Sequence, residues 1–91
     1  MNKREKRLLK ASREGNVAAF EELIKPHLTR VYNIMLNFCN NEFEASHYAQ
    51  EVFVRVFESV MKKDSLSLSY EIYKTAAELS RSIEHKDAMI L

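Results

Sequence analysis

Glycine and proline are nearly missing from this chain, which has one of each, Gly15 and Pro26, among its 91 residues. The reversals of a β-sheet rely on turns, and turns rely heavily on these two residue types. Their scarcity therefore favours a few long helices joined by short breaks. We predict an all-α fold, a compact bundle of about four helices, because a chain of this length has material for one small core.

Four segments carry apolar side chains at steps of three and four residues, which is the spacing of amphipathic helices. Gly15 and Asn16 separate the first segment from the second, as a helix C-cap followed by an N-cap. Asn40 and Asn41 separate the second from the third. Pro26 lies within the second segment and predicts a kink or a break there, because proline removes a backbone donor and crowds the preceding turn.

The serine-rich run at 65–69 predicts a loop and the start of the fourth helix. Polar residues follow Ile83 and predict the end of the domain. We therefore expect one helical domain over residues 1–84 and a tail, or the start of a linker, over residues 85–91.

The third segment, EASHYAQEVFVRVFESV at 44–60, has one apolar residue on the wrong face of a helix. Its predicted buried stripe comprises Tyr48, Val52, Phe53, Val56, Phe57 and Val60. Val54 instead shares a face with polar residues, namely His47, Gln50, Glu51 and Glu58. An amide and carboxylates around one exposed aliphatic side chain are typical of a face that docks an arginine-rich partner. The alternative is a scattered surface hydrophobe, which needs no special explanation.

No motif in the chain points to catalysis, a cofactor or a bound metal. It has no glycine-rich phosphate loop and no serine nucleophile motif. The residues that could ligate zinc lack the short spacings of zinc sites: His27, Cys39, His47 and His85. A single cysteine gives no internal disulfide, and no apolar run is long enough for a signal peptide or a membrane span. We therefore expect a cytoplasmic protein that is not an enzyme and has no membrane partner.

Three stretches of the chain resemble region 2 of bacterial sigma factors, in the extracytoplasmic-function (ECF) group of the sigma-70 family. They are GNVAAFEELI at 15–24, RVYNIML at 30–36 and the third segment at 44–60. The resemblance extends over about residues 8–83 and is strongest at AQEVFVRVF. It implies a helical domain that takes part in transcription initiation. In that family the third helix binds the clamp helices of the largest RNA polymerase subunit, and the following loop and fourth helix read and melt the promoter −10 element.

The resemblance assigns polymerase binding, by position, to His47, Gln50, Glu51, Val54 and Glu58. Gln50 and Glu51 match the polymerase-binding pair of the family. His47 stands where the family usually has an acidic residue that pairs with a polymerase arginine. On this interpretation Val54 is exposed because another protein covers it.

Contact with a melted promoter strand needs aromatic platforms and cationic side chains. The DNA-binding candidates are Lys62, Lys63, Tyr70, Tyr73, Lys74 and Arg81, although each tyrosine also suits a core position. The fourth helix departs from the family pattern, with Glu71 at the position of a tryptophan and Glu78 at that of an asparagine. Residues 65–84 contain two basic and three acidic side chains, which predicts weak DNA binding.

Two interpretations of the function stay open. The first is a transcription initiation module that binds the polymerase core and touches promoter DNA. The second is a degenerate sigma-like interaction domain that binds polymerase, or a regulatory protein such as an anti-sigma factor, without productive DNA recognition. The chain has no counterpart of the family's second domain, region 4. It is therefore expected to be either a piece of a longer factor or a domain that works with a partner.

Overall fold

The computed structural model describes the backbone of residues 2–62 and 67–90, and side chains as far as residue 83. Its elements are α1 Lys3–Arg13, α2 Val17–Ile24, the 3-10 turn η1 Lys25–His27, α3 Leu28–Cys39, α4 Glu42–Lys62 and α5 Leu68–Ile90. No strand occurs in the described ranges, and the predicted all-α class is confirmed.

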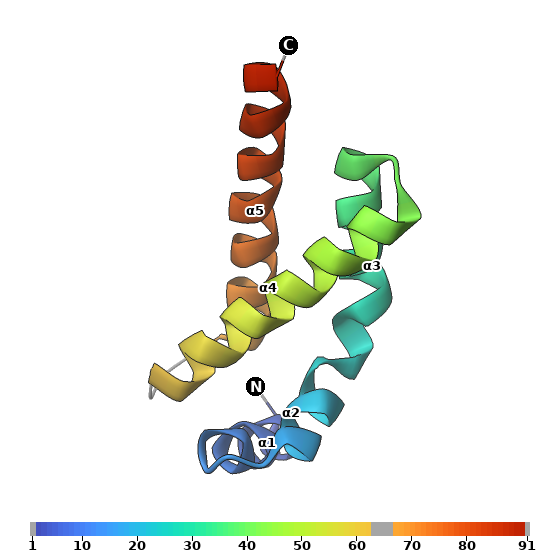
Figure 1. The fold of residues 1–91 in the computed structure, drawn as a ribbon. Helices are drawn as coiled ribbons and strands as arrows, with labels where there is room; N and C mark the ends of the chain where they lie inside the picture. Colours follow the sequence, from blue (N-terminus) through green and yellow to red (C-terminus); the bar gives the residue numbers. More distant parts are fainter. Residues whose placement is uncertain (1, 63–66, 91) are drawn as a thin grey trace.

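Helix α4 lies across α3 and α5 and packs against both of them (Figure 1). Helices α1 and α2 pair with each other at one end of the molecule, and the C-terminal part of α5 lies at the other end. The domain is elongated, with extents of 47 × 21 × 20 Å. This arrangement leaves the long outer side of α4 uncovered by any other helix in the described part of the chain.

The predicted helix boundaries at 15–16 and 40–41 are confirmed by the backbone and by side-chain caps. The side chains of Asn16 and Asn41 each accept a hydrogen bond, both 3.0 Å long, from the backbone N–H three residues further on. Gly15 and Asn40 precede them with φ values of 95° and 52°. These left-handed conformations end α1 and α3, because they turn the chain out of the helix.

Pro26 divides the second predicted helix into α2 and α3. The proline lies within η1, whose three residues tighten into a 3-10 turn before α3 begins at Leu28. This is the break that the missing backbone donor predicted. As a result α2 leaves the line of α3 and pairs with α1 instead.

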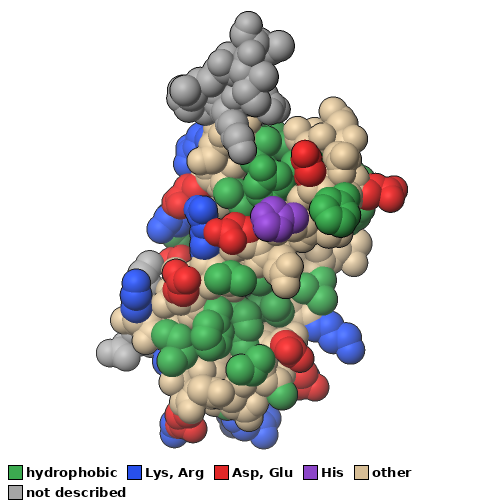
Figure 2. Space-filling model, in the orientation of Figure 1, with side chains coloured by type: hydrophobic (Ala, Val, Ile, Leu, Met, Phe, Trp, Pro, Cys, Tyr) green, Lys and Arg blue, Asp and Glu red, His purple; other side chains and the backbone are tan. Residues whose placement is uncertain are grey.

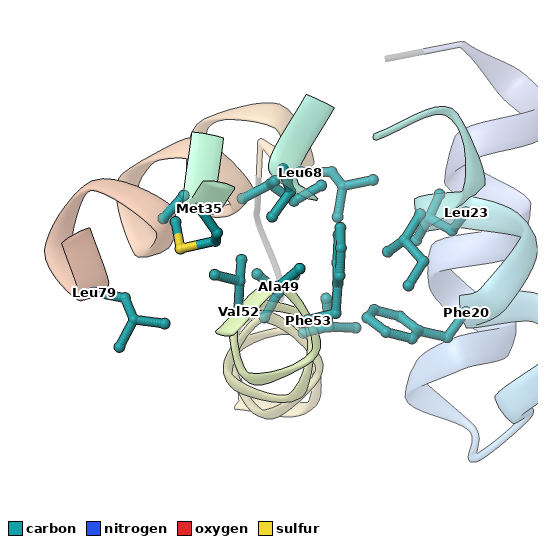
Figure 3. Packing of buried hydrophobic residues seen from close by; sticks show 14 of the residues in the cluster. Phe20, Leu23, Met35, Ala49, Val52, Phe53, Leu68 and Leu79 are labelled. Atoms are coloured by element: carbon teal, nitrogen blue, oxygen red, sulfur yellow. The ribbon is translucent and has the colours of Figure 1, made fainter. Parts of the chain in front are cut away.

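The core lies where α3, α4 and α5 meet and continues toward α2 (Figure 3). Side chains with no exposed surface include Val31, Met35, Val52, Val56, Val60 and Ile72. In the predicted buried stripe of α4, Phe53 is also buried, and Tyr48 and Phe57 pack against the core while partly exposed. The sequence therefore assigned the inner side of α4 correctly.

Helix α5 continues to Ile90, through the segment for which the sequence predicted a tail or linker. The polar residues after Ile83 do not end the helical backbone. The division of the chain into a domain and a tail stays a prediction.

Met35 provides a test of this core. Replacing Met35, which has no exposed surface, by alanine leaves a cavity between α3 and its neighbours. We expect Met35→Ala to lower the free energy of unfolding by about 2 to 5 kcal/mol, measured by urea denaturation. Asn37→Ala changes an exposed residue of the same helix and should alter it by no more than about 0.5 kcal/mol. Equal losses in the two variants would contradict this packing.

Candidate docking face on helix α4

The polar face predicted for α4 lies on its solvent side. His47, Gln50, Val54 and Glu58 are exposed, and Glu51 is half-buried. We call these five residues the docking face. Val54 lies at its centre with 49% of its surface exposed, whereas Val52 and Val56 on the opposite side have none. The sequence therefore placed all five on the correct side of a helix.

Two more apolar residues of α4 lie in line with Val54 and were not singled out from the sequence. Phe43 is 86% exposed and Met61 is 46% exposed. They stand eleven positions before and seven positions after Val54, which are close to whole numbers of helical turns. The same spacing argument that isolated Val54 would have found them. The exposed side of α4 thus carries apolar residues over about 27 Å of its length.

An ion pair on the docking face also escaped the sequence reasoning. Nε of Arg55 lies 3.1 Å from Oε1 of Glu51, one helical turn away, and both side chains are 40% or more exposed. Such a surface pair is worth only about 0.3 to 0.5 kcal/mol. The Glu51 carboxylate is therefore held in place weakly and stays free to exchange Arg55 for a cation of a partner.

Two hollows lie side by side along α4 and share Ile24, Gln50 and Phe53. The first, which we call the α2–α4 groove, measures about 410 Å³ and is lined by Val17, Phe20, Glu21, Ile24, Gln50, Phe53, Val54 and Phe57. The second measures about 340 Å³ and is lined by Ile24, Leu28, Tyr32, Ser46, Ala49, Gln50 and Phe53. Figure 2 shows hydrophobic side chains gathered beside α4 on this side of the molecule. The docking face therefore borders an apolar depression.

The floor of the α2–α4 groove is built from aromatic rings. The rings of Phe20 and Phe57 meet edge to face, with centroids 4.9 Å apart and an interplanar angle of 72°. Phe20 and Phe53 are buried, and Figure 3 shows them side by side between α2 and α4. Because these rings pack against one another, the floor has a fixed shape before any partner arrives.

The DNA-binding candidates do not form one group in the structure. Tyr70 is 64% exposed, and Nζ of Lys74 lies 5.9 Å from the centroid of its ring. Lys74 and Arg81 are exposed, and their spacing from Tyr70 puts all three on one side of α5. Lys62 is exposed at the end of α4, and Lys63 lies outside the described residues.

Tyr73 differs from Tyr70 because its contacts are internal. Its hydroxyl lies 3.1 Å from Nδ1 of His27, and the two rings meet edge to face at 5.9 Å between centroids. The guanidinium carbon of Arg30 lies 5.9 Å from the centroid of the same ring. Tyr73 is half-buried and joins α5 to η1 and α3. The sequence gave no sign of the contact with His27, because the two residues are far apart along the chain.

The acidic excess predicted for α5 is not present on its described surface. Glu71 is only 5% exposed, so its carboxylate does not contribute an ordinary surface charge. The side chain of Glu84 lies outside the described residues. The exposed charged side chains of α5 up to residue 83 are therefore Lys74, Glu78 and Arg81.

The residues that the structure describes form neither a metal site nor a membrane span. No group of three or more His, Cys, Asp or Glu side chains there is placed to hold a metal ion. Among the described helices, none combines the length and the apolar character needed to cross a membrane.

Comparison with known proteins gives a family match to the sequence of this chain. A family model of sigma-70 region 2 matches residues 23–75, more than half of the chain, including α3 and α4. The ECF RNA polymerase sigma factor SigE of Mycolicibacterium smegmatis is 38% identical over 47 residues, which cover 52% of this chain and 18% of that protein. The match thus spans less than a fifth of that relative's length. No solved structure gives a significant match.

The contrast between the two tyrosines of α5 can be measured. Tyr73→Phe removes the hydroxyl that bonds His27 and leaves the imidazole without that partner. We expect it to lower the free energy of unfolding by about 0.5 to 1.5 kcal/mol in urea denaturation. Tyr70→Phe makes the same chemical change at an exposed ring and should leave stability unchanged. A loss of similar size in Tyr70→Phe would argue against a structural role specific to Tyr73.

Proposed function

This chain belongs to the sigma-70 region 2 family, and we propose that it binds the core of RNA polymerase through the docking face of α4. We also propose that it makes weak contact with the −10 element of promoter DNA. It acts by binding rather than by catalysis. Its place of action is the cytoplasm, where polymerase and promoter are found.

The exposed position of Val54 among polar side chains is the observation that carries the polymerase contact. Val54 is half exposed, and Gln50, Glu51 and Glu58 surround it on the same side of α4. Interfaces bury an apolar centre within a polar margin, and carboxylates at that margin bind arginine through charge-assisted hydrogen bonds. The clamp helices of the largest polymerase subunit are the partner that the family assigns to this helix.

His47 completes the docking face at its N-terminal end. An imidazole can donate or accept a hydrogen bond, whereas the acidic residue common in the family accepts only. We therefore assign His47 a hydrogen-bonding role at the edge of the interface. The ionic part of the contact falls to Glu51 and Glu58.

Contact with the melted promoter strand is assigned to the exposed side of α5. Tyr70 offers a ring for base stacking, and Lys74 and Arg81 offer cations for the phosphate backbone. Lys62 and Lys63 flank this surface in sequence and are candidates for further phosphate contacts. Tyr73, being tied to His27, supports the position of α5 instead of stacking on a base.

In a second possible function, the docking face binds another protein but the chain does not recognise DNA. Glu71 and Glu78 stand where the family has tryptophan and asparagine, and Glu71 is turned into the protein. On this alternative the docking face binds polymerase or an anti-sigma type of regulator. The promoter-strand experiment described below separates the two functions.

The polymerase contact predicts a large effect at Val54. Val54→Asp places an unpaired charge at the dry centre of the interface, and we expect the Kd for a purified clamp-helix fragment to rise by at least about tenfold. Glu51→Ala should weaken binding less, because its carboxylate lies at the margin. Fluorescence anisotropy with the labelled fragment measures both. Asn37→Asp adds the same side chain at an exposed position of α3 and should leave the Kd unchanged. An unaltered Kd in Val54→Asp would remove the docking face from the interface.

The promoter contact predicts weak binding with a shallow dependence on salt. At most four cationic contacts to a single strand, from Lys62, Lys63, Lys74 and Arg81, give a slope of log K against log salt no steeper than about −3. Anisotropy with a labelled promoter-like single strand at several salt concentrations measures that slope. Tyr70→Ala should weaken binding, whereas Tyr70→Phe should not, because the ring stacks and the hydroxyl is dispensable. Equal binding by wild type and Tyr70→Ala would favour the function without DNA recognition.

A further inference from the structure

The two walls of the α2–α4 groove repeat the same spacing of residues. Val17, Phe20, Glu21 and Ile24 line it from α2, and Gln50, Phe53, Val54 and Phe57 line it from α4. Each set is spaced by three, one and three positions, so each forms one continuous side of its helix. Val17 at 58% exposure and Val54 at 49% stand on opposite rims above the aromatic floor. Half of the groove therefore belongs to a helix outside the docking face.

The charge that lines the groove is acidic. Glu21 is the charged residue among those that line it, and no lysine or arginine of the described chain lines either the groove or the adjoining hollow. Glu51 and Glu58 add carboxylates on the docking face. Arg55, next to them, is already paired with Glu51. A partner that fills this depression is favoured when it carries basic residues beside apolar ones.

We propose that the α2–α4 groove is the second half of the polymerase contact and receives the apolar side of a basic amphipathic helix of the clamp. Val17 is an apolar contact on the α2 rim of the groove, and Glu21 pairs with a lysine or arginine of that helix. This inference rests on the proposed function, since the groove shares Gln50 and Val54 with the docking face. It adds α2 to an interface that the resemblance confined to α4.

A helix suits this groove better than an extended strand. Peptide helices dock through side chains at i, i+3, i+4 and i+7, which lie along one line and fill a trough between two helices. The continuation of the groove into the second hollow beyond Gln50 gives such a helix room to lie along α4. The described groove walls also offer no unpaired strand edge to an extended peptide.

The test compares substitutions on α2 with matched controls that leave the groove unchanged. Val17→Ser removes apolar surface from the rim without adding charge. Its control is Ala18→Ser at the next position, which is exposed and does not line the groove. Glu21→Lys reverses the charge at the rim, and Glu78→Lys makes the same reversal on the exposed surface of α5. All four positions are surface positions of helices, so the variants should fold, which circular dichroism verifies.

Affinity for the purified clamp-helix fragment is then measured for the full chain by anisotropy. We expect Val17→Ser to raise the Kd about fivefold, in proportion to the apolar area left uncovered. Glu21→Lys should raise it about tenfold at low salt, and this effect should shrink as salt rises because the charges are screened. Ala18→Ser and Glu78→Lys should leave the Kd within about twofold.

The outcomes separate the groove from the docking face. Weakening by Val54→Asp together with unchanged binding in Val17→Ser and Glu21→Lys overturns the groove contact and leaves the proposed function standing. Unchanged binding in Val54→Asp overturns both. Equal weakening by the α2 variants and their controls also overturns the groove contact, because it shows that the loss does not depend on lining the groove.

Discussion

The burial of one side of α4 between α3 and α5 is the constraint on which the rest of the structure depends. Val52, Val56 and Val60 follow one another by four residues and have no exposed surface, so they fix the rotation of the helix about its own axis. Once that rotation is fixed, Gln50, Val54 and Glu58 have to face solvent. The chemistry of the docking face is thus a consequence of packing on the opposite side. No local preference of those residues for solvent has to be invoked.

The same constraint explains why an exposed valine is informative here. A small domain of this length has few apolar side chains to spare, and each one left in water contributes nothing to the core. Yet Phe43, Val54 and Met61 all lie on the outer side of one helix, and Val17 faces Val54 across an apolar groove. Scattered surface hydrophobes need no explanation, but three in line on one helix, with Val54 and Val17 beside a preformed aromatic floor, are the arrangement expected of a surface that is covered in a complex.

Helical periodicity was enough to predict the inner and outer sides of α4. The chemistry of single residues was enough to predict the break at Pro26, the N-cap at Asn16 and the helix boundary at Asn40 and Asn41, because each of these is a local property of the backbone. The groove and the role of Tyr73 could not be predicted in this way. Both depend on how helices far apart in sequence come together: Val17 and Val54 line one groove from two helices, and His27 contacts Tyr73. The burial of Glu71 is of the same kind, since a count of charges along the chain says nothing of which ones face inward.

The exposed sides of α4 and α5 differ in how much binding energy each can supply alone. This difference fits a domain that works inside a larger assembly. The surface of α4 combines apolar area with carboxylates, whereas the exposed side of α5 offers one ring and two cations beside an acid, Glu78. Such a strand-binding surface is weak for free DNA. With α4 fixed to polymerase as proposed, the promoter strand held by that polymerase would reach α5 at a high effective concentration, and a weak contact would then suffice. Strong DNA affinity of the isolated domain would add nothing to recognition in that setting and would favour unspecific binding elsewhere.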